Sequence, residues 1–258
     1  MKKNKLKTKL LNDEIVIGPF LKIIDPALVE ISAYAGFDFV IIDSEHGPIN
    51  MESAQNLIRA AEAADITPII RVLRNEEETL LKALDIGPHG IEVPQINNLH
   101  QVQRLKKSVK YNPEGQRGVC CYVRAADYSK INRSNEAKQE YFKRANEELL
   151  VIAHIEGLEG VENIDKILKE EVIDVVFIGP YDLSQSLGKP GQVDNPAVKK
   201  EMEYIIKKAK QQGKIVGTFV DNVDNAREWI DIGVRFIAYS VDVGIFYEKC
   251  AEIVSDLK

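Results

Sequence analysis

Short apolar runs alternate with longer amphipathic segments along the chain. Eight of these runs are rich in valine and isoleucine: Ile15–Phe20, Phe39–Asp43, Pro68–Arg71, Gly90–Val93, Leu150–Glu156, Asp174–Gly179, Ile215–Val220 and Phe236–Ser240. Apolar runs of this length are typical of strands that are buried on both faces, as in a parallel sheet. The pattern therefore predicts eight parallel strands that are separated by helices.

The predicted helices have recognisable end signals. Asp25 precedes Pro26 and can cap a helix that stops near Gly36. Asn75 together with Glu78 resembles a capping box at the start of a later helix. These signals place helices in the segments between the predicted strands.

Eight strand–helix alternations in 258 residues favour the α/β fold of a (β/α)8 TIM barrel, with residues 1–258 as one domain. An open doubly wound sheet is the alternative, but no GxGxxG motif follows the first strand. Residues 112–149 fall outside the alternation and predict an extra loop and a polar helix. The last helix, from about Val243 to Leu257, has an apolar stripe, and we expect it to close the outer ring of the barrel.

Composition narrows the class of protein. The net charge is -6 with acidic and basic residues mixed, so we expect no basic face for nucleic acid. The apolar runs are too short to span a membrane, and no signal-type apolar stretch follows the basic start of the chain. Three cysteines form neither a disulfide framework nor a CxxC metal pair, which is typical of a reducing, cytoplasmic location.

Charged and polar residues follow several predicted strands at the point where each strand ends. These segments are Asp43–Pro48, Arg71, His154–Glu156 and Gly179–Asp182. In a TIM barrel the carboxyl ends of the strands meet on the face that contains the active site. Because an isolated buried charge is costly, the convergence of acids, imidazoles and an arginine predicts an active site on this face.

Glu156 and Asp182 are candidates to bind a hard divalent cation. They follow neighbouring predicted strands at the same level, and two carboxylates with room for water suit Mg²⁺ or Mn²⁺. The alternative is a solvated pair, or a carboxylate that caps the following helix. For Asp182, which precedes Leu-Ser, helix capping explains the residue as well as metal binding does.

His46 and Arg71 are candidates for proton transfer and for anion binding. The ordinary pKa of an imidazole suits proton transfer near neutral pH, although a lone histidine in a loop is more often structural. Arg71 can grip a carboxylate through two hydrogen bonds, or it can pair with Glu45 or Asp43 in a structural role.

Other basic residues contribute less to the predicted active-site face. No lysine stands at the carboxyl end of a predicted strand, so we expect no catalysis through a lysine imine, and stabilisation of negative charge on a substrate falls to a metal ion. Arg117 and Arg124 lie in and after a turn-rich loop at residues 112–118. A structured turn is slightly favoured there over an anion-binding wall for the distal end of a substrate.

Three segments resemble the HpcH/HpaI aldolase family of class II, metal-dependent pyruvate aldolases: Ile41–Pro48, Ala153–Glu156 and Phe177–Ser184. The resemblance extends from about Gly18 to Val243. It implies a barrel of the phosphoenolpyruvate/pyruvate type. It also implies reversible aldol cleavage of a 4-hydroxy-2-oxo acid, such as a 2-keto-3-deoxy sugar acid, to pyruvate and an aldehyde.

The resemblance also implies roles for individual residues. His46 is the base that acts at the substrate hydroxyl, and Asp85 pairs with a histidine across a subunit boundary. Arg71 holds the pyruvyl oxygens and stabilises the enolate. Glu156 and Asp182 bind the metal, which is Mg²⁺, Mn²⁺ or Co²⁺.

Other positions at the implied substrate site concern binding and selectivity. The backbone near Tyr181 and Asp182 contacts the substrate carboxylate, and Tyr181 replaces a smaller residue of well-known members. His154 stands where the family usually has glutamine, which implies a hydrogen bond to the substrate keto oxygen or ligation of the metal. Glu92 and Gln95 are unusual and narrow the acceptor side of the pocket.

The resemblance implies a homohexamer, a trimer of dimers in which the C-terminal helix is exchanged between subunits. Two alternatives for function remain open. One is an acyl-CoA lyase of the citrate lyase β-subunit or malyl-CoA lyase type, for which Arg117 and Arg124 would line a basic channel. The other is a barrel that has lost catalysis and serves as a binding protein.

Overall fold

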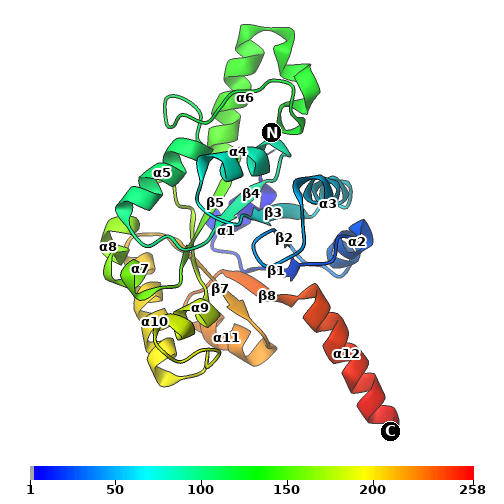
Figure 1. Ribbon diagram of the computed structural model, residues 1–258, viewed down its shortest axis with the longest axis vertical. Helices are drawn as coiled ribbons and strands as arrows, with labels where there is room; N and C mark the ends of the chain where they lie inside the picture. The colour runs from blue at the N-terminus through cyan, green and yellow to red at the C-terminus, as the bar shows by residue number, and fades with distance from the viewer. Residues whose placement is uncertain (1–2) are drawn as a thin grey trace.

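Eight parallel strands form a closed barrel in chain order, with β8 paired to β1 (Figure 1). The computed structural model describes residues 3–258. The strands are β1 (Val16–Leu21), β2 (Phe39–Asp43), β3 (Thr67–Arg71), β4 (Gly90–Val93), β5 (Leu150–Ile155), β6 (Val175–Ile178), β7 (Ile215–Val220) and β8 (Phe236–Val241). The predicted (β/α)8 barrel is therefore confirmed.

Helices surround the barrel and connect its strands. The connecting helices are α2 (Pro26–Tyr34), α3 (Met51–Ala63), α4 (Glu77–Asp85), α5 (Leu99–Val109), α7 (Leu158–Glu162), α8 (Ile164–Ile167), α9 (Pro180–Ser186), α10 (Pro196–Gln211) and α11 (Val223–Asp231). The additions to this plan are α1 (Lys5–Leu11), the 3-10 segment η1 (Arg124–Arg133), α6 (Asn135–Glu148) and α12 (Asp242–Leu257).

The barrel interior is filled by side chains that alternate along the strands. Phe39 and Phe236 stack inside it with ring centroids 4.2 Å apart. Leu6 and Leu10 of α1 join the same cluster, so α1 covers the amino-terminal end of the barrel. This helix is absent from the apolar-run pattern because basic residues surround its two buried leucines.

The predicted helix start is right for α2 and wrong for α4. The Asp25 carboxylate accepts a hydrogen bond of 2.9 Å from the backbone N–H of Ala27. No capping box forms at Asn75, because α4 begins after Glu76, whose side chain makes no capping hydrogen bond. The Asn75 amide donates instead to the carbonyl of Gln101 at 2.8 Å.

The insertion predicted at residues 112–149 forms η1 and α6. These two elements share a small core of their own, made by Tyr111, Ala126, Ile131, Tyr141 and Ala145. In Figure 1, α6 (green) extends away from the barrel.

Helix α12 projects from the barrel into solvent instead of packing in the outer ring (Figure 1). Phe246 and Tyr247 are 71% and 72% exposed, and Asp242 is its one buried residue. The expectation that this helix closes the outer ring is therefore wrong for a single chain. Across residues 3–258, no helix combines the length and apolar character that a membrane crossing requires.

Candidate active site

A pocket of about 380 Å³ opens at the carboxyl ends of the strands. Of the seven predicted site residues, six line it: His46, Arg71, His154, Glu156, Tyr181 and Asp182. They come from the ends of different strands, which is where a TIM barrel assembles its chemistry. Asp85 is the exception. It is the last residue of α4 and therefore lies at the amino-terminal end of the barrel.

Arg71 is clamped on one wall of the pocket by Asp43. The register pairs these residues on adjacent strands, and Nε and Nη2 of Arg71 donate to the two Asp43 oxygens at 2.9 and 2.8 Å. Burial alone would raise the pKa of Asp43, but the hydrogen bond and charge of Arg71 outweigh burial and lower it. The guanidinium also lies over the Phe20 ring, 4.5 Å from its centroid. Its orientation in the pocket is therefore fixed.

The loop after β2 places an imidazole and a second carboxylate beside this clamp. Asp43 accepts the backbone N–H groups of Glu45 and His46 at 3.1 and 3.2 Å, which holds the turn. The His46 side chain is 59% exposed, and its Nε2 lies 4.0 Å from Oε2 of Glu45. Burial raises the pKa of Glu45 to about 7, although Arg71, at 3.2 Å, opposes the shift. Glu45 was not a predicted catalytic residue.

His154 lies between two carboxylates at the bottom of the pocket. Its Nδ1 is 2.9 Å from Oε2 of Glu156, and its Nε2 contacts Oε1 of Glu92. The ring stacks on Phe177 with centroids 4.4 Å apart, and the imidazole is 99% buried. Glu92 was expected to narrow the acceptor side of the pocket; it lies inside β4, level with Arg71, and is paired with His154.

The protonation of His154 follows from these partners. Burial alone would lower its pKa, but the negative charges of Glu156 and Glu92 outweigh burial and raise it. An imidazole that faces carboxylates with both nitrogens donates through both and is a cation. In this arrangement neither nitrogen is free for a substrate keto oxygen or for a metal ion. The contact between His154 and Glu92 could have been predicted from the sequence, because Glu92 is the one charged residue in the apolar run Gly90–Val93.

Glu156 and Asp182 form the acidic side of the pocket. Glu156 follows β5 and accepts the backbone N–H of Gln95 at 2.8 Å. Gly179 packs against it so closely that any side chain there would overlap the Glu156 carboxylate. Asp182 lies in the first turn of α9 without a capping hydrogen bond, so the capping alternative is wrong. Burial and then the negative charge of Glu156 raise the pKa of Asp182.

This pair fits a hard divalent cation of the Mg²⁺ type. Repulsion between the buried Glu156 carboxylate and the more exposed Asp182 carboxylate is relieved when a cation lies between them. Within residues 3–258, no group of three or more histidine, cysteine or acidic side chains is arranged to hold a metal. Mg²⁺ commonly uses one or two protein carboxylates and completes its shell with water and substrate oxygens. Glu156 and Asp182 are the residues that could hold it.

Lys22 also lines the pocket, so the expectation of a mouth without lysine is wrong. Strand β1 extends to Leu21, one residue beyond the predicted end, and Lys22 follows it directly. Its Nζ lies 3.9 Å from Oδ2 of Asp43. The alternation of side chains along β1, with Phe20 directed inward, was the signal that could have identified it.

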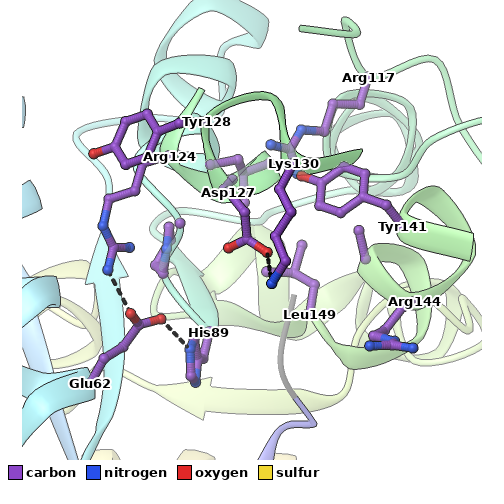
Figure 2. Close-up of a pocket in the computed structure, with 15 residues that line it drawn as sticks. Glu62, His89, Arg117, Arg124, Asp127, Tyr128, Lys130, Tyr141, Arg144 and Leu149 are labelled. Atoms are coloured by element: carbon purple, nitrogen blue, oxygen red, sulfur yellow. Dashed lines mark hydrogen bonds and ion pairs between the residues drawn. The ribbon is translucent and has the colours of Figure 1, made fainter. Parts of the chain in front are cut away.

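A second cavity, of about 420 Å³, lies at the amino-terminal ends of the strands beneath η1 and α6 (Figure 2). Figure 2 shows Glu62 between His89 and Arg124, at 3.1 and 2.6 Å. Arg117, which also lines this cavity, donates through Nη2 to Asp85 at 3.1 Å. Arg124 and Arg117 are thus neutralised by acids, and in one chain they lie far from the barrel mouth.

The position of Asp85 separates it from His46 within one chain. Asp85 is held by Arg117 at the amino-terminal end of the barrel, whereas His46 lies at the carboxyl-terminal end. The pairing of Asp85 with a histidine across a subunit boundary therefore needs a second chain. The same arrangement removes Arg117 and Arg124 from any channel that leads out of the pocket of their own chain.

Comparison with known proteins identifies the family. Residues 17–248 match the model of the HpcH/HpaI aldolase/citrate lyase family. The chain belongs to this family. The HpcH/HpaI member described here is 31% identical to a hydroxypyruvate/pyruvate aldolase of Pseudomonas aeruginosa, over 99% of this chain and 93% of that protein. It is 29% identical to a 5-keto-4-deoxy-D-glucarate aldolase of an Enterobacter species, over 99% and 97% of the two chains.

Among solved structures, this HpcH/HpaI member resembles the citrate synthase SbnG. The two chains are 34% identical, the match covers 97% of this chain and 96% of that one, and the TM-score is 0.87. The relatives therefore include both aldolases and a citrate synthase. Membership in this family supports the conclusion that the chain is an enzyme of the aldolase and lyase type.

Proposed function

We propose that this HpcH/HpaI family member catalyses reversible aldol cleavage of a 4-hydroxy-2-oxo acid to pyruvate and an aldehyde. The observation that supports this most strongly is the pocket that brings Arg71, His46, Glu156 and Asp182 together at the barrel mouth. Two aldolases match nearly the whole chain: one, at 29% identity, is named after such a substrate, and the other, at 31%, is named after hydroxypyruvate and pyruvate. A barrel that only binds a ligand does not require a proton acceptor beside an arginine and two carboxylates.

Arg71 stabilises the charge that develops when the carbon–carbon bond breaks. Cleavage leaves an enolate of pyruvate, whose oxygen is negative. The Asp43 clamp holds the guanidinium before substrate arrives, so little reorganisation is needed during the reaction. Nη1 of Arg71 lies 3.2 Å from Oε2 of Glu45.

His46 accepts the proton of the substrate 4-hydroxyl. It is the exposed imidazole at the pocket, and retro-aldol cleavage requires a base at that hydroxyl. Glu45, 4.0 Å from Nε2 of His46, is a carboxylate that can stabilise the imidazolium once the proton has moved. In the reverse direction the same proton returns to the alkoxide that forms when pyruvate adds to the aldehyde.

The cofactor is a divalent cation, Mg²⁺, Mn²⁺ or Co²⁺, held by Glu156 and Asp182. When bound, it supplies positive charge beside the oxygens of the 2-oxo acid. The backbone around Tyr181 and Asp182, at the start of α9, contacts the substrate carboxylate. His154 acts through Glu156: its Nδ1, 2.9 Å from the carboxylate, sets the orientation of that ligand. We therefore assign His154 as a positioning residue.

The active form is an assembly, for which we propose the hexamer, a trimer of dimers with exchanged C-terminal helices. The apolar side chains of α12, including Phe246 at 71% exposed and Ile253 at 48%, suit a cover from another subunit. A second chain is also the route by which Asp85 of the partner subunit would reach His46. We place the enzyme in the cytoplasm, in agreement with its three free cysteines.

A second candidate is a reaction with an acyl-CoA, for which the likeness to the citrate synthase at 34% identity is the specific support. In that reaction the nucleophile is the enolate of a thioester, and the acceptor is a 2-oxo acid. Release of free thiol from acetyl-CoA in the presence of oxaloacetate would favour this candidate.

The experiment that tests the proposed function measures pyruvate. The metal-loaded enzyme is incubated with a panel of racemic 4-hydroxy-2-oxo acids, and pyruvate is detected with lactate dehydrogenase and NADH. We expect pyruvate release that chelation abolishes and added Mg²⁺ or Mn²⁺ restores. Absence of pyruvate from every member of the panel, together with thiol release from acetyl-CoA, would replace the aldolase with the second candidate.

A further inference from the structure

Lys22 is held at the pocket mouth by contacts to its backbone. The Asp242 carboxylate, at the start of α12, accepts the backbone N–H of Lys22 at 3.0 and 3.1 Å. It also accepts the N–H of Ile23 at 2.8 Å. These bonds fix the chain where it leaves β1, and side-chain alternation then directs Lys22 to the same side as Phe20, into the pocket.

The ammonium group of Lys22 has no acid to neutralise it fully. Its nearest carboxylate oxygen is Oδ2 of Asp43, and 3.9 Å is beyond hydrogen-bonding distance. Asp43 is already engaged, because it accepts two hydrogen bonds from Arg71 and the backbone N–H groups of Glu45 and His46. Among residues 3–258, the Lys22 side chain makes no hydrogen bond, so its three N–H donors are available for a ligand.

Lys22 lies across the barrel mouth from the acidic side of the pocket. In the closed barrel, β1 is four strands from β5 in either direction, so Lys22 and Glu156 face each other across the opening. A substrate whose 2-oxo acid end lies near Glu156 and Asp182 extends toward Lys22 at its other end. Arg71, on β3, lies between the two sides.

We propose that Lys22 forms a subsite for a second carboxylate, at the end of the substrate that becomes the aldehyde product. This inference rests on the proposed function and narrows the range of substrates. The preferred substrates are then dicarboxylic 4-hydroxy-2-oxo acids, and the preferred aldehydes bear a carboxylate. A buried or half-buried ammonium group favours a carboxylate by charge-assisted hydrogen bonding, and an uncharged hydroxymethyl group gains much less there.

The test compares two aldehydes of similar size that differ in charge. With pyruvate as the donor, kcat/KM is measured for glyoxylate and for glycolaldehyde in the wild type, Lys22→Met and Lys22→Arg. Methionine keeps the length of the side chain without its charge, and arginine keeps the charge. Lys166→Met, which removes an exposed lysine of α8, is the matched control.

We expect Lys22→Met to lower the ratio of kcat/KM for glyoxylate over glycolaldehyde by about ten- to a hundredfold, the usual effect of losing a hydrogen bond between charged groups. Lys22→Arg should keep most of the wild-type ratio, and Lys166→Met all of it. An unchanged ratio in Lys22→Met would overturn the subsite, as would covalent trapping of pyruvate on Lys22 by borohydride.

Failure of the proposed function would be seen separately. If the wild type forms no product from either aldehyde, binding of 2-oxoglutarate and 2-oxobutyrate is measured by calorimetry in the presence of Mg²⁺. If the subsite exists, Lys22→Met should weaken the binding of 2-oxoglutarate by about ten- to a hundredfold more than the binding of 2-oxobutyrate. Equal losses for the two ligands would reject the subsite whatever the enzyme's reaction.

Discussion

Nδ1 of His154 lies 2.9 Å from Oε2 of Glu156, and the other nitrogen of the same buried ring faces Glu92. One imidazolium thus bridges two buried carboxylates and leaves a net negative charge, and one of the two carboxylates is a proposed metal ligand. The pKa of His154 is raised by these charges against the effect of burial. A buried cation therefore lies beneath the acidic side of the pocket. Removal of that cation should lower the stability of the folded barrel.

The first prediction concerns this buried group. His154→Gln leaves Glu92 as an uncompensated buried charge and should lower the free energy of unfolding by about 3–5 kcal/mol. The double change His154→Gln with Glu92→Leu should recover most of the loss, because glutamine can still donate to Glu156. Denaturant unfolding measures both. Equal stability of wild type and His154→Gln would show that the imidazolium is not needed to balance these carboxylates.

The second prediction concerns pH and Glu45. Its pKa is raised to about 7 in the folded protein, above its ordinary value of 4.5, mainly by burial. The folded state then favours the protonated form, so the associated stability is present below pH 4.5 and is lost as pH rises through 7. Relative to the wild type, metal-free Glu45→Gln should gain about 2 kcal/mol of stability between pH 5 and pH 8. Parallel pH curves for the two proteins would refute the shifted pKa.

The third prediction concerns the metal ligands. Asp182→Asn preserves the shape of the side chain but removes one of two negative charges, so Mn²⁺ should bind at least about tenfold more weakly. Asp224→Asn is the control, because Asp224 is 93% exposed in α11. Titration of Mn²⁺ by electron paramagnetic resonance measures both affinities. Wild-type affinity in Asp182→Asn would remove Asp182 from the metal site.

Much of this site could be predicted because parallel strands bring their carboxyl ends to one face. The register that pairs Asp43 with Arg71, and Arg71 with Glu92, follows from that geometry. The residue with which each of these groups pairs was harder to predict from the sequence. An arginine at a strand end has several acids within reach. Only the packed barrel shows that Asp43 accepts hydrogen bonds from two nitrogens of Arg71, while Glu45 lies near the third nitrogen.

Other features depended on contacts that a linear pattern does not reveal. Lys22 was missed because β1 continues for one apolar residue beyond its predicted end. His154 appeared to be a substrate ligand because Glu92, its partner, is 62 residues away in the chain. The apolar stripe of α12 predicted a face packed on the barrel, but that face is exposed in a single chain, because a stripe does not say which surface covers it.

The fourth prediction separates proton transfer from enolate stabilisation. Retro-aldol cleavage requires a base, whereas decarboxylation of oxaloacetate gives the same enolate with carbon dioxide as the leaving group. His46→Ala should therefore lower the aldolase rate by roughly a hundred- to ten-thousandfold and retain much of the decarboxylase rate. Arg71→Ala should impair both reactions, because both develop charge on the same oxygen.

The comparison of the two reactions also tests Asp85. Asp85→Asn should resemble a milder His46→Ala if the partner subunit's carboxylate supports the imidazole. Equal loss of both reactions in His46→Ala, with normal folding and metal binding, would make His46 a substrate-binding group and not the base.

The most direct test of the central claim is exchange of the methyl protons of pyruvate. Formation of the enolate is common to both directions of the proposed reaction and needs no knowledge of the aldehyde. In heavy water, the metal-loaded wild type should replace these protons with deuterium, as followed by proton NMR. The chelated enzyme and Arg71→Ala should exchange far more slowly. A metal-loaded, folded wild type that leaves pyruvate unexchanged would contradict the assignment of this pocket to pyruvate enolate chemistry.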